Sequence, residues 1–295
     1  AAAACSILEL DQELTTMAIS LAASQAAGLR QNFGTMTKPY HAGASCRAGV
    51  TSAKLAKAGF TASEDAIEGR FGFLRAFSGG SGYDENHIME TLGKQCYLVE
   101  SGVEVKKYPC CGSAHLALDA TYRLLERETI NADEVESIQV SVDFDPPRSL
   151  IHARPTEALE GKFSMQYCLA AAILDQKVGL DSFTDELVQR PEAQTLIPKV
   201  EMHRIAGYEG RPSWVEAYNE VEVHLTDGRV LSERADRITQ GALRGVSMEE
   251  IQSKFQGTAS RAISAPASNE LMEILDRLEN MGELSRMTDL LRGEG

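Results

Sequence analysis

Long apolar runs are missing from this 295-residue sequence, and none approaches the roughly 20 residues that a membrane-spanning helix needs. Basic residues are scarce: the sequence has 29 Lys and Arg but 43 Asp and Glu, which gives a formal net charge of -14. So acidic a chain is a poor match for nucleic acid or for an anionic membrane surface. We therefore expect neither a nucleic acid nor a membrane among its partners.

Paired cysteines and targeting signals are also missing. The six cysteines form no Cys-x-x-Cys pair and no zinc-binding spacing. This pattern predicts free thiols in a reducing compartment and no metal site. The first 14 residues are apolar but have no basic start, so they do not resemble a signal peptide. We expect a cytoplasmic protein, or a mitochondrial one if the source is eukaryotic.

Helical patterns occupy both ends of the sequence. Residues 10–29 are rich in Ala, Leu and Met, and residues 44–58 predict a second helix that ends at Gly59. A capping box at 61–64, of the form T-x-x-E, predicts a short helix directly after it. Near the other end, Ser247 begins a second capping box, and residues 269–292 have the pattern of one long amphipathic helix.

The middle of the sequence has a different character. Residues 135–142 alternate apolar and polar, which is typical of a half-buried strand. Asp227-Gly228 lies between two alternating runs and predicts a hairpin, and residues 196–205 predict a further strand. Helices are expected over 113–130 and 163–175.

We therefore predict a multidomain protein that combines all-α and α+β parts. Residues 1–103 and 241–295 together form an all-α domain built from both chain ends. Residues 104–240 form a smaller α+β lid domain that is inserted between them.

One stretch of this acidic sequence contains no acidic residue. From Leu14 to Ser63 there is no Asp or Glu, although the second half of the stretch carries several Lys and Arg. Clustered cations without nearby acids are what binding an anionic small molecule requires. A buried pair of helices would also exclude acids, and that alternative explains residues 14–29 better than residues 30–57.

Two basic segments are candidates for the anion site. Residues 32–43 are predicted to form a loop, with Pro39 holding Lys38 extended, before a helix that starts near Gly43 and leaves its N–H groups free for an anion. This would present Lys38 and His41 beside a helix N-terminus. Residues 105–115 hold Lys106 and the turn Pro-Cys-Cys-Gly before a helix at Ser113.

Several residues in the second segment have simpler interpretations. Lys107 is expected to be solvated, and His115 to be an ordinary helix residue. A metal site of Cys110, Cys111 and His115 is disfavoured, because adjacent cysteines rarely bind one tetrahedral ion.

The stretches NFGTMTKPYHAG and KKYPCCGSAH resemble the two signature segments of the MmgE/PrpD family, and GKFSMQYCLAAAILDQKVGLDSF in the middle resembles that family as well. The family includes 2-methylcitrate dehydratase, cis-aconitate decarboxylase and epimerases of amino-dicarboxylates. The resemblance implies a helical domain from both chain ends, an α+β lid, a site between them, and neither metal nor organic cofactor.

The resemblance also implies roles for individual residues. Lys38, His41 and Lys106 fall on the family's catalytic positions, while Tyr167 and Cys111 fall on substrate-binding positions. The decarboxylase has a histidine where this chain has Cys111, and the dehydratase-like branch commonly has Cys-Cys there, which argues against decarboxylation. Compared with the family pattern, the chain begins inside the helical domain, and a first third carrying an acidic residue and a histidine of the site has no counterpart.

The expected function is therefore that of a lyase that dehydrates a 2-methylcitrate-like tricarboxylate. Decarboxylation of cis-aconitate, epimerisation, or a non-catalytic form that keeps the anion pocket or the dimer interface are the alternatives. The expected partners are a small polycarboxylate substrate, a second copy of the chain in a homodimer, and a separate chain that supplies the missing helices.

Overall fold

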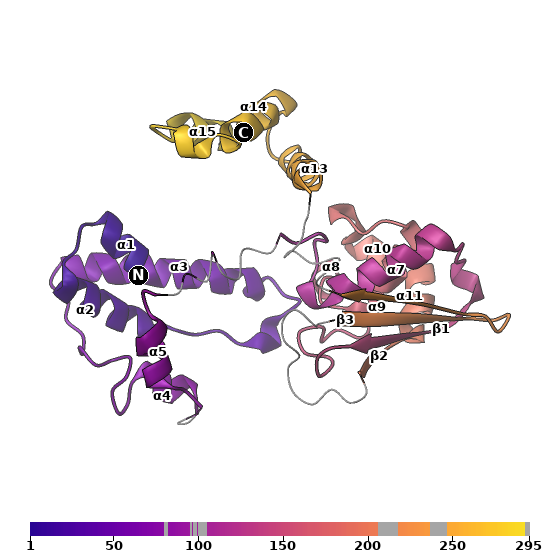
Figure 1. Ribbon diagram of the computed structural model, residues 1–295, viewed down its shortest axis with the longest axis horizontal. Helices are drawn as coiled ribbons and strands as arrows, with labels where there is room; N and C mark the ends of the chain where they lie inside the picture. Colours follow the sequence, from indigo (N-terminus) through magenta and orange to yellow (C-terminus); the bar gives the residue numbers. More distant parts are fainter. Residues whose placement is uncertain are drawn as a thin grey trace.

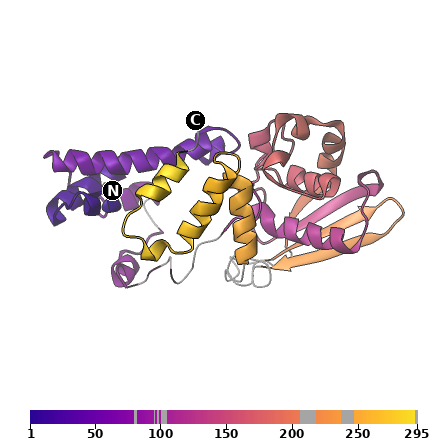
Figure 2. The same ribbon diagram turned by 90° about the horizontal axis from the view of Figure 1, so that it is seen from above.

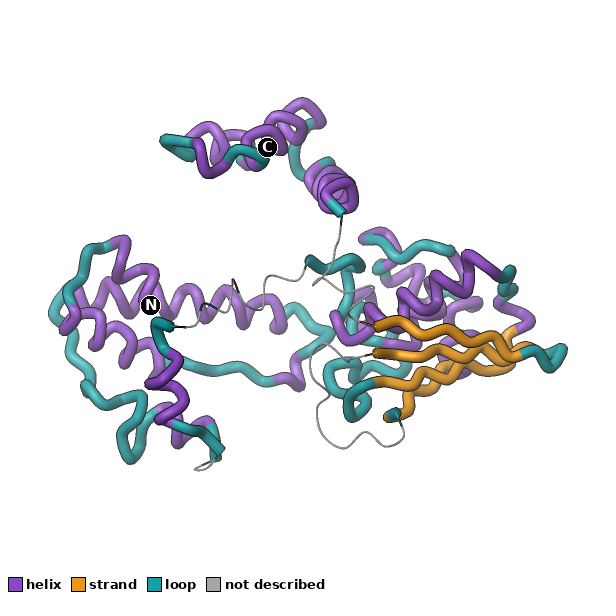
Figure 3. The backbone as a smooth tube through the Cα atoms, in the orientation of Figure 1, coloured by secondary structure: helices purple, strands orange, loops and turns teal. Residues whose placement is uncertain are grey.

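The computed structural model describes residues 1–79, 82–94, 96, 99, 105–205, 218–236 and 247–292. Within these residues, strands occur in one part of the chain, after a run of helices and before another (Figure 3). The sequence prediction of a helical start, an α+β middle and a helical end is confirmed for this part of the molecule. No described helix has the length and apolar character to cross a membrane.

The first part consists of short helices around one longer helix. Their bounds are α1 Ala2–Ile7, α2 Gln12–Ala23, α3 Thr37–Lys57, α4 Phe73–Phe77 and α5 Glu85–Thr91. Helix α2 begins at Gln12 because the Asp11 side chain caps the N–H of Leu14. Small side chains such as Ala18 and Ala53 let α2 and α3 approach closely, as expected for the Ala-rich segment.

Two helix predictions are wrong, one for the segment after residues 61–64 and one for residues 269–292. The segment at 61–64 does not cap a helix: residues 64–68 form turns, and the next helix, α4, starts only at Phe73. The Ser63 hydroxyl is instead bonded to the Asp65 carboxylate. The long amphipathic helix of 269–292 is divided into the helices α14 Ala265–Leu275 and α15 Ser285–Leu291. The capping box of Ser247 and Glu250 does begin α13, Met248–Ala259.

The middle part is a two-layer α+β unit with a four-stranded sheet in the order β2-β1-β3-β4. The strands are β1 Val135–Val142, β2 Val200–Arg204, β3 Tyr218–Leu225 and β4 Val230–Asp236. β1 pairs with β2 in parallel, and β3 pairs antiparallel with β1 and with β4. The predicted hairpin at Asp227-Gly228 joins β3 to β4, with Gly228 in the left-handed region at φ +87°.

Helices cover one face of this sheet (Figure 1). They are α7 His115–Arg127, α8 Ala158–Gly161, α9 Met165–Asp175, α10 Asp185–Gln189 and α11 Pro191–Leu196. Alternate residues of β1 and β3, such as Ile138 and Val223, are fully buried under the helices, whereas the residues between them face away. This explains the alternating sequence pattern, since only one face of the sheet meets the core.

The N-terminal helices and the sheet lie at opposite ends of the molecule (Figures 1 and 2). Helix α13 and the turn after it contact the α+β part: Lys254 in the helix donates to the backbone oxygen of Lys106 at 2.5 Å, and Arg261 in the turn pairs with Asp181 at 2.5 Å. The expected domain boundaries near 103 and 240 fall outside the described residues. One helical domain built from both chain ends therefore stays a prediction.

Candidate functional site

Helix α3 starts earlier than the sequence suggested. It begins at Thr37, so Lys38 and His41 lie in its first two turns rather than in a loop. The expectation of an extended Lys38 is wrong because Pro39 falls in the first helical turn. A residue there has no intrahelical partner for its N–H, so proline loses no hydrogen bond at that position.

The start of α3 also differs from the predicted anion site. Its first turn has no acidic residue, as expected. However, Thr35 occupies the first donors: its hydroxyl accepts from the N–H of Thr37 and its carbonyl from the N–H of Lys38, both at 3.2 Å. Pro39 has no N–H to offer. Any anion at this end of α3 must therefore be bound by side chains and not by free backbone donors.

Lys38 lies above two aromatic rings. Its ammonium group is 6.0 Å from the ring centre of Phe33 and 5.9 Å from that of Phe163, and the two rings are 5.3 Å apart. The side chain is exposed, so its charge remains accessible to a ligand. His41 follows three positions later on the same side of α3, half-buried, with its ring against Gly28.

The segment before α3 is bound to the α+β part. The carbonyl of Phe33 contacts Nε2 of His152 at 2.7 Å, and Arg30 donates to the carbonyl of Arg148 at 2.8 Å. Gly34 is buried with φ +89°, and a Cβ atom there would lie 2.2 Å from His152 Nε2. The contact is therefore close enough to require glycine. Nothing in the sequence around His152 had marked it as part of this contact.

The second basic segment forms the predicted turn before α7, with a 3-10 turn over 112–114 ahead of His115. The ammonium group of Lys106 donates to the carbonyl of Cys110 at 2.8 Å, which folds the lysine back over its own turn. The N–H of Cys111 donates to the carbonyl of Lys162 at 2.9 Å. Cys111 itself is half-buried.

Each of the two basic segments contacts one of two consecutive residues in a third segment. Lys38 lies over the ring of Phe163, and Cys111 is bonded to the backbone of Lys162. Ser164 then caps α9 by accepting from the N–H of Tyr167, which fixes this corner on the core of the α+β part. Lys38 and Cys111, which are more than 60 positions apart in the sequence, therefore both contact the same corner, formed by residues 162–163.

A cavity of about 600 Å³ opens beside Lys106. It is lined by the turn 106–109, the loop 177–181 and helix α13, and its lining holds five cationic and three acidic side chains: Lys106, Lys107, Lys177, Lys254, Arg261, Asp181, Glu249 and Glu250. Arg261 is already paired with Asp181. Lys38 and His41 are not among the lining residues, so the convergence of all three predicted catalytic residues on one ligand stays a prediction.

Lys107 is not simply solvated, which corrects the sequence interpretation. Its ammonium group pairs with the buried carboxylate of Asp119 at 2.9 Å, and the hydroxyl of Tyr108 donates to the same oxygen at 2.7 Å. Burial, together with the negative charge of Asp119, raises the pKa of Tyr108 far above its usual value. Lys107 therefore compensates a buried charge, and its loss would affect the fold as well as the surface charge.

Tyr167 lies in the core of the α+β part. Its side chain is 0% exposed, and its hydroxyl donates to the carbonyl of Ser182. Burial raises its pKa to about 12. This placement gives Tyr167 a structural contact, and its expected role in substrate binding stays a prediction.

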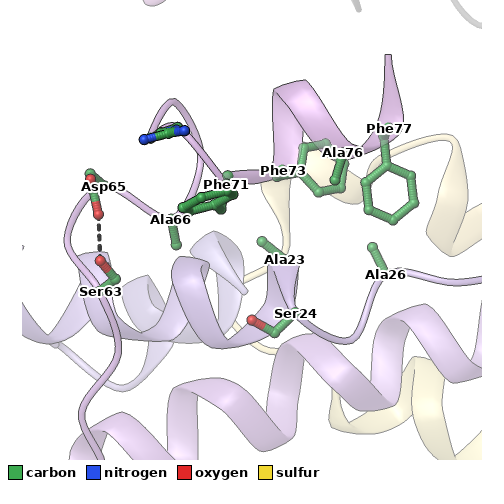
Figure 4. A pocket seen from close by; sticks show the side chains of 13 residues that line it. Ala23, Ser24, Ala26, Ser63, Asp65, Ala66, Phe71, Phe73, Ala76 and Phe77 are labelled. Carbon is green, nitrogen blue, oxygen red and sulfur yellow. Dashed lines mark hydrogen bonds between the residues drawn. The ribbon is translucent and has the colours of Figure 1, made fainter. Parts of the chain in front are cut away.

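A second cavity, of about 490 Å³, lies among the N-terminal helices (Figure 4). Phe71, Phe73 and Phe77 line it opposite Ala23 and Ala26 at the end of α2, and the rings of Phe73 and Phe77 stack at 4.5 Å. Polar side chains, including those of Arg70 and Asp65, line it as well. Neither Lys38 nor Lys106 is among its lining residues, so this cavity is separate from the two basic segments.

Comparison with known proteins identifies the relatives of this chain. The model of the MmgE/PrpD N-terminal domain matches residues 1–86, and that of the MmgE/PrpD C-terminal domain matches residues 108–280. The chain belongs to the MmgE/PrpD family. The resemblance noted in the two basic segments is thereby confirmed.

Curated members of this family are similar over almost the whole chain. Cis-aconitate decarboxylase of Homo sapiens is 27% identical over 300 residues, which are 99% of this chain and 60% of that protein. Cis-aconitate decarboxylase of Aspergillus terreus is 25% identical over 301 residues, covering 97% of this chain and 61% of that protein. The chain thus spans about three fifths of the length of these relatives.

Replacing Gly34 tests the contact between the segment before α3 and His152. We expect Gly34→Ala to lower the free energy of unfolding by more than about 1–2 kcal/mol, because the left-handed φ disfavours alanine and the new Cβ collides with the His152 ring. Gly43→Ala is the matched control. It lies within α3 with nothing within 4 Å of its new Cβ, and should be neutral or stabilising by up to about 1 kcal/mol. Urea denaturation measures both, and equal effects would contradict the contact.

Tyr167→Phe separates a structural role from a role in binding. The variant keeps the ring but removes the donor to the Ser182 carbonyl, which should lower the free energy of unfolding by about 1–3 kcal/mol. If the contact is structural only, the affinity of the folded variant for citrate should not change. Denaturation and calorimetry measure the two effects separately. Weaker binding with unchanged stability would instead support the substrate-binding role implied by the family resemblance.

Proposed function

We propose that this protein binds a small polycarboxylate at Lys38 and Lys106 and acts on it as a lyase. The attachment of both basic segments to the corner at residues 162–163 is the observation that supports this most strongly. The exposed ammonium group of Lys38 and the cavity beside Lys106 offer positive charge and room for a ligand of this size. The catalytic activity named for the relatives is consistent with such a substrate.

The chemistry requires fixed positive charge. A proton next to a carboxylate is very weakly acidic, because its removal adds charge to an existing anion. Lysine ammonium groups held near the carboxylates stabilise that charge in the transition state. Lys38 and Lys106 have this role in the proposal, and His41, on the same side of α3 as Lys38, transfers a proton.

Two lyase reactions are compatible with this arrangement. Dehydration of a 2-methylcitrate-like acid is our first candidate, because Cys111 stands where the resemblance places a histidine in the decarboxylase. Decarboxylation of cis-aconitate is the second candidate, because the relatives described above carry that name. In the first reaction one group removes the proton and another protonates the hydroxyl group, which leaves as water; in the second a carboxylate leaves as carbon dioxide and the resulting carbanion takes up a proton.

Association with a second copy of the chain is also part of the proposal. The shared core of the N-terminal helices is small and consists of Met17 with alanine and cysteine side chains, whereas Ile7, Met36 and Phe71 are 83%, 79% and 88% exposed. Large apolar side chains that gather on an exposed surface are typical of surfaces that bind another protein. A separate chain that supplies further helices is the alternative occupant of the same surface.

Lysine replacements test the anion site directly. Lys38→Ala and Lys106→Ala should each weaken citrate binding about ten- to a hundredfold, because a charge-assisted contact contributes about 1.5–3 kcal/mol. The control is Lys57→Ala. Lys57 lies at the far end of α3, about 28 Å from Lys38 along the helix axis at a rise of about 1.5 Å per residue. Calorimetry at low salt gives the affinities. Equal weakening in all three variants would indicate nonspecific charge attraction and contradict the site.

Turnover assays with 2-methylcitrate and cis-aconitate then distinguish the two reactions. Loss of water from the first supports dehydration, and release of carbon dioxide from the second supports decarboxylation. Citrate binding that depends on Lys38 and Lys106 without turnover of either acid would support the non-catalytic alternative, and inversion of a stereocentre in an amino-dicarboxylate would support an epimerase.

Light scattering tests the association. We expect the purified chain at micromolar concentration to have at least twice the 32.1 kDa mass of one copy, because the exposed apolar side chains of the N-terminal helices favour a shared interface. Met36→Glu together with Phe71→Glu should shift the distribution toward the monomer, whereas Val230→Glu, in the hairpin of the α+β part, should not. A stable wild-type monomer would contradict the proposal.

A further inference from the structure

The buried thiols beside Lys106 have no role in the function proposed above. Cys110 is 4% exposed in the turn before α7, and Cys168 is 0% exposed on α9. The two side chains are close enough for the Cys168 thiol to interact with the Cys110 sulfur. Each thiol has one hydrogen, and the alternative acceptors for it are backbone carbonyls, that of Cys111 at 3.8 Å for Cys110 and that of Gly161 at 3.7 Å for Cys168.

We propose that Cys110 and Cys168 are a redox-active pair that forms a reversible disulfide when the protein encounters a peroxide. The pair joins two segments that are already packed together, because Cys111 is bonded to the backbone of Lys162, directly after Gly161. In this structure all six cysteines are free thiols, so it shows the reduced form.

The surroundings of Cys110 favour the reactive form of its thiol. The hydrogen bond from Cys168, and then the nearby His115 and Lys106, lower the pKa of Cys110 to about 6, although burial acts in the opposite direction. The pKa of Cys168 is raised by the same hydrogen bond and by burial, so it remains the protonated partner. His115 Nε2 is buried without a hydrogen-bond partner, which leaves it available to a negative charge at Cys110.

The reaction balances with peroxide as the oxidant. The Cys110 thiolate attacks one peroxide oxygen, the O–O bond breaks, and hydroxide leaves, which gives a sulfenic acid on Cys110. The Cys168 sulfur then attacks the Cys110 sulfur, the S–O bond breaks, and the hydroxyl group leaves as water with the thiol proton. In sum, two thiols and one hydrogen peroxide give one disulfide and two waters. A dithiol reductant reverses the bond by thiol exchange.

Burial directs this chemistry toward the disulfide. A peroxide reaches the pair through local opening of the turn, and reclosure places Cys168 against the sulfenic acid before a second peroxide arrives. Cys46, by contrast, is exposed on α3. The new bond would also hold the carbonyl of Cys110, which binds the ammonium group of Lys106, in a new position.

Mass spectrometry of the oxidised full-length chain tests the pair. After brief exposure to hydrogen peroxide and alkylation of the remaining thiols, we expect a cross-linked peptide that contains Cys110 and Cys168 and disappears on reduction. The rate of its formation should rise with pH around 6 and then level off, because the Cys110 thiolate is the attacking form. In the Cys168→Ala variant, Cys110 should instead be trapped as a sulfenic acid by a 1,3-diketone probe.

Two results would overturn the proposal. One is a chain in which Cys46 is fully oxidised while Cys110 and Cys168 remain reduced, and the other is a disulfide between Cys110 and Cys111. Because these outcomes are read from the wild-type chain, they do not depend on the folding of the variant. They also do not depend on catalysis or citrate binding, so the disulfide and the proposed function can fail separately.

Discussion

The contact between the segment before α3 and the loop around His152 is the constraint on which the candidate site depends. It combines a hydrogen bond from Nε2 of His152 to the carbonyl of Phe33, the tilted packing of the Phe33 ring on Phe163, and a glycine at position 34 that no larger residue can replace without moving the His152 ring. Without this contact, Lys38 would have no fixed position relative to the α+β part. The position of one candidate catalytic charge therefore follows from backbone geometry and aromatic packing.

The α+β part supplies the rigid half of this arrangement. Its core is the largest in the described chain, and α9 is buried within it from Met165 to Ile173. The corner at residues 162–163 directly precedes α9. Lys38 and Cys111 therefore contact residues that are held in position by a well-packed helix. The N-terminal helices have a small core in comparison, which explains why their position depends on contacts with this corner and, in our proposal, on a second copy of the chain.

The sequence predicted the parts of the fold that depend on local patterns. The alternation in β1, the Asp-Gly turn after β3 and the capping box at Ser247 each involve neighbouring residues, and the structure confirms them. The start of α3 was misplaced because the preference of a residue before proline was given more weight than the tolerance of the first helical turn for proline. Parallel pairing of β2 with β1 could not be predicted, because nothing local specifies it.

The candidate site, like the fold, could be predicted only in part from the sequence. The two basic segments were recognisable from their charge and from the family pattern, but the residues that connect them were not. His152 and Phe163 lie far from both segments in the sequence, and their role becomes visible only when the chain is folded. Lys107 was misinterpreted for the same reason, since its buried partner Asp119 lies on the following helix.

Hydrogen exchange in the presence of citrate tests the central claim most directly, which is that both basic segments serve one ligand. If they do, citrate should slow exchange of the backbone amides of residues 37–41 and of residues 105–111 together, with the same dependence on citrate concentration, and Lys38→Ala should weaken both effects equally. Protection of one segment alone, or protection of the two segments at clearly different concentrations, would show that Lys38 and Lys106 belong to separate sites and would contradict the account.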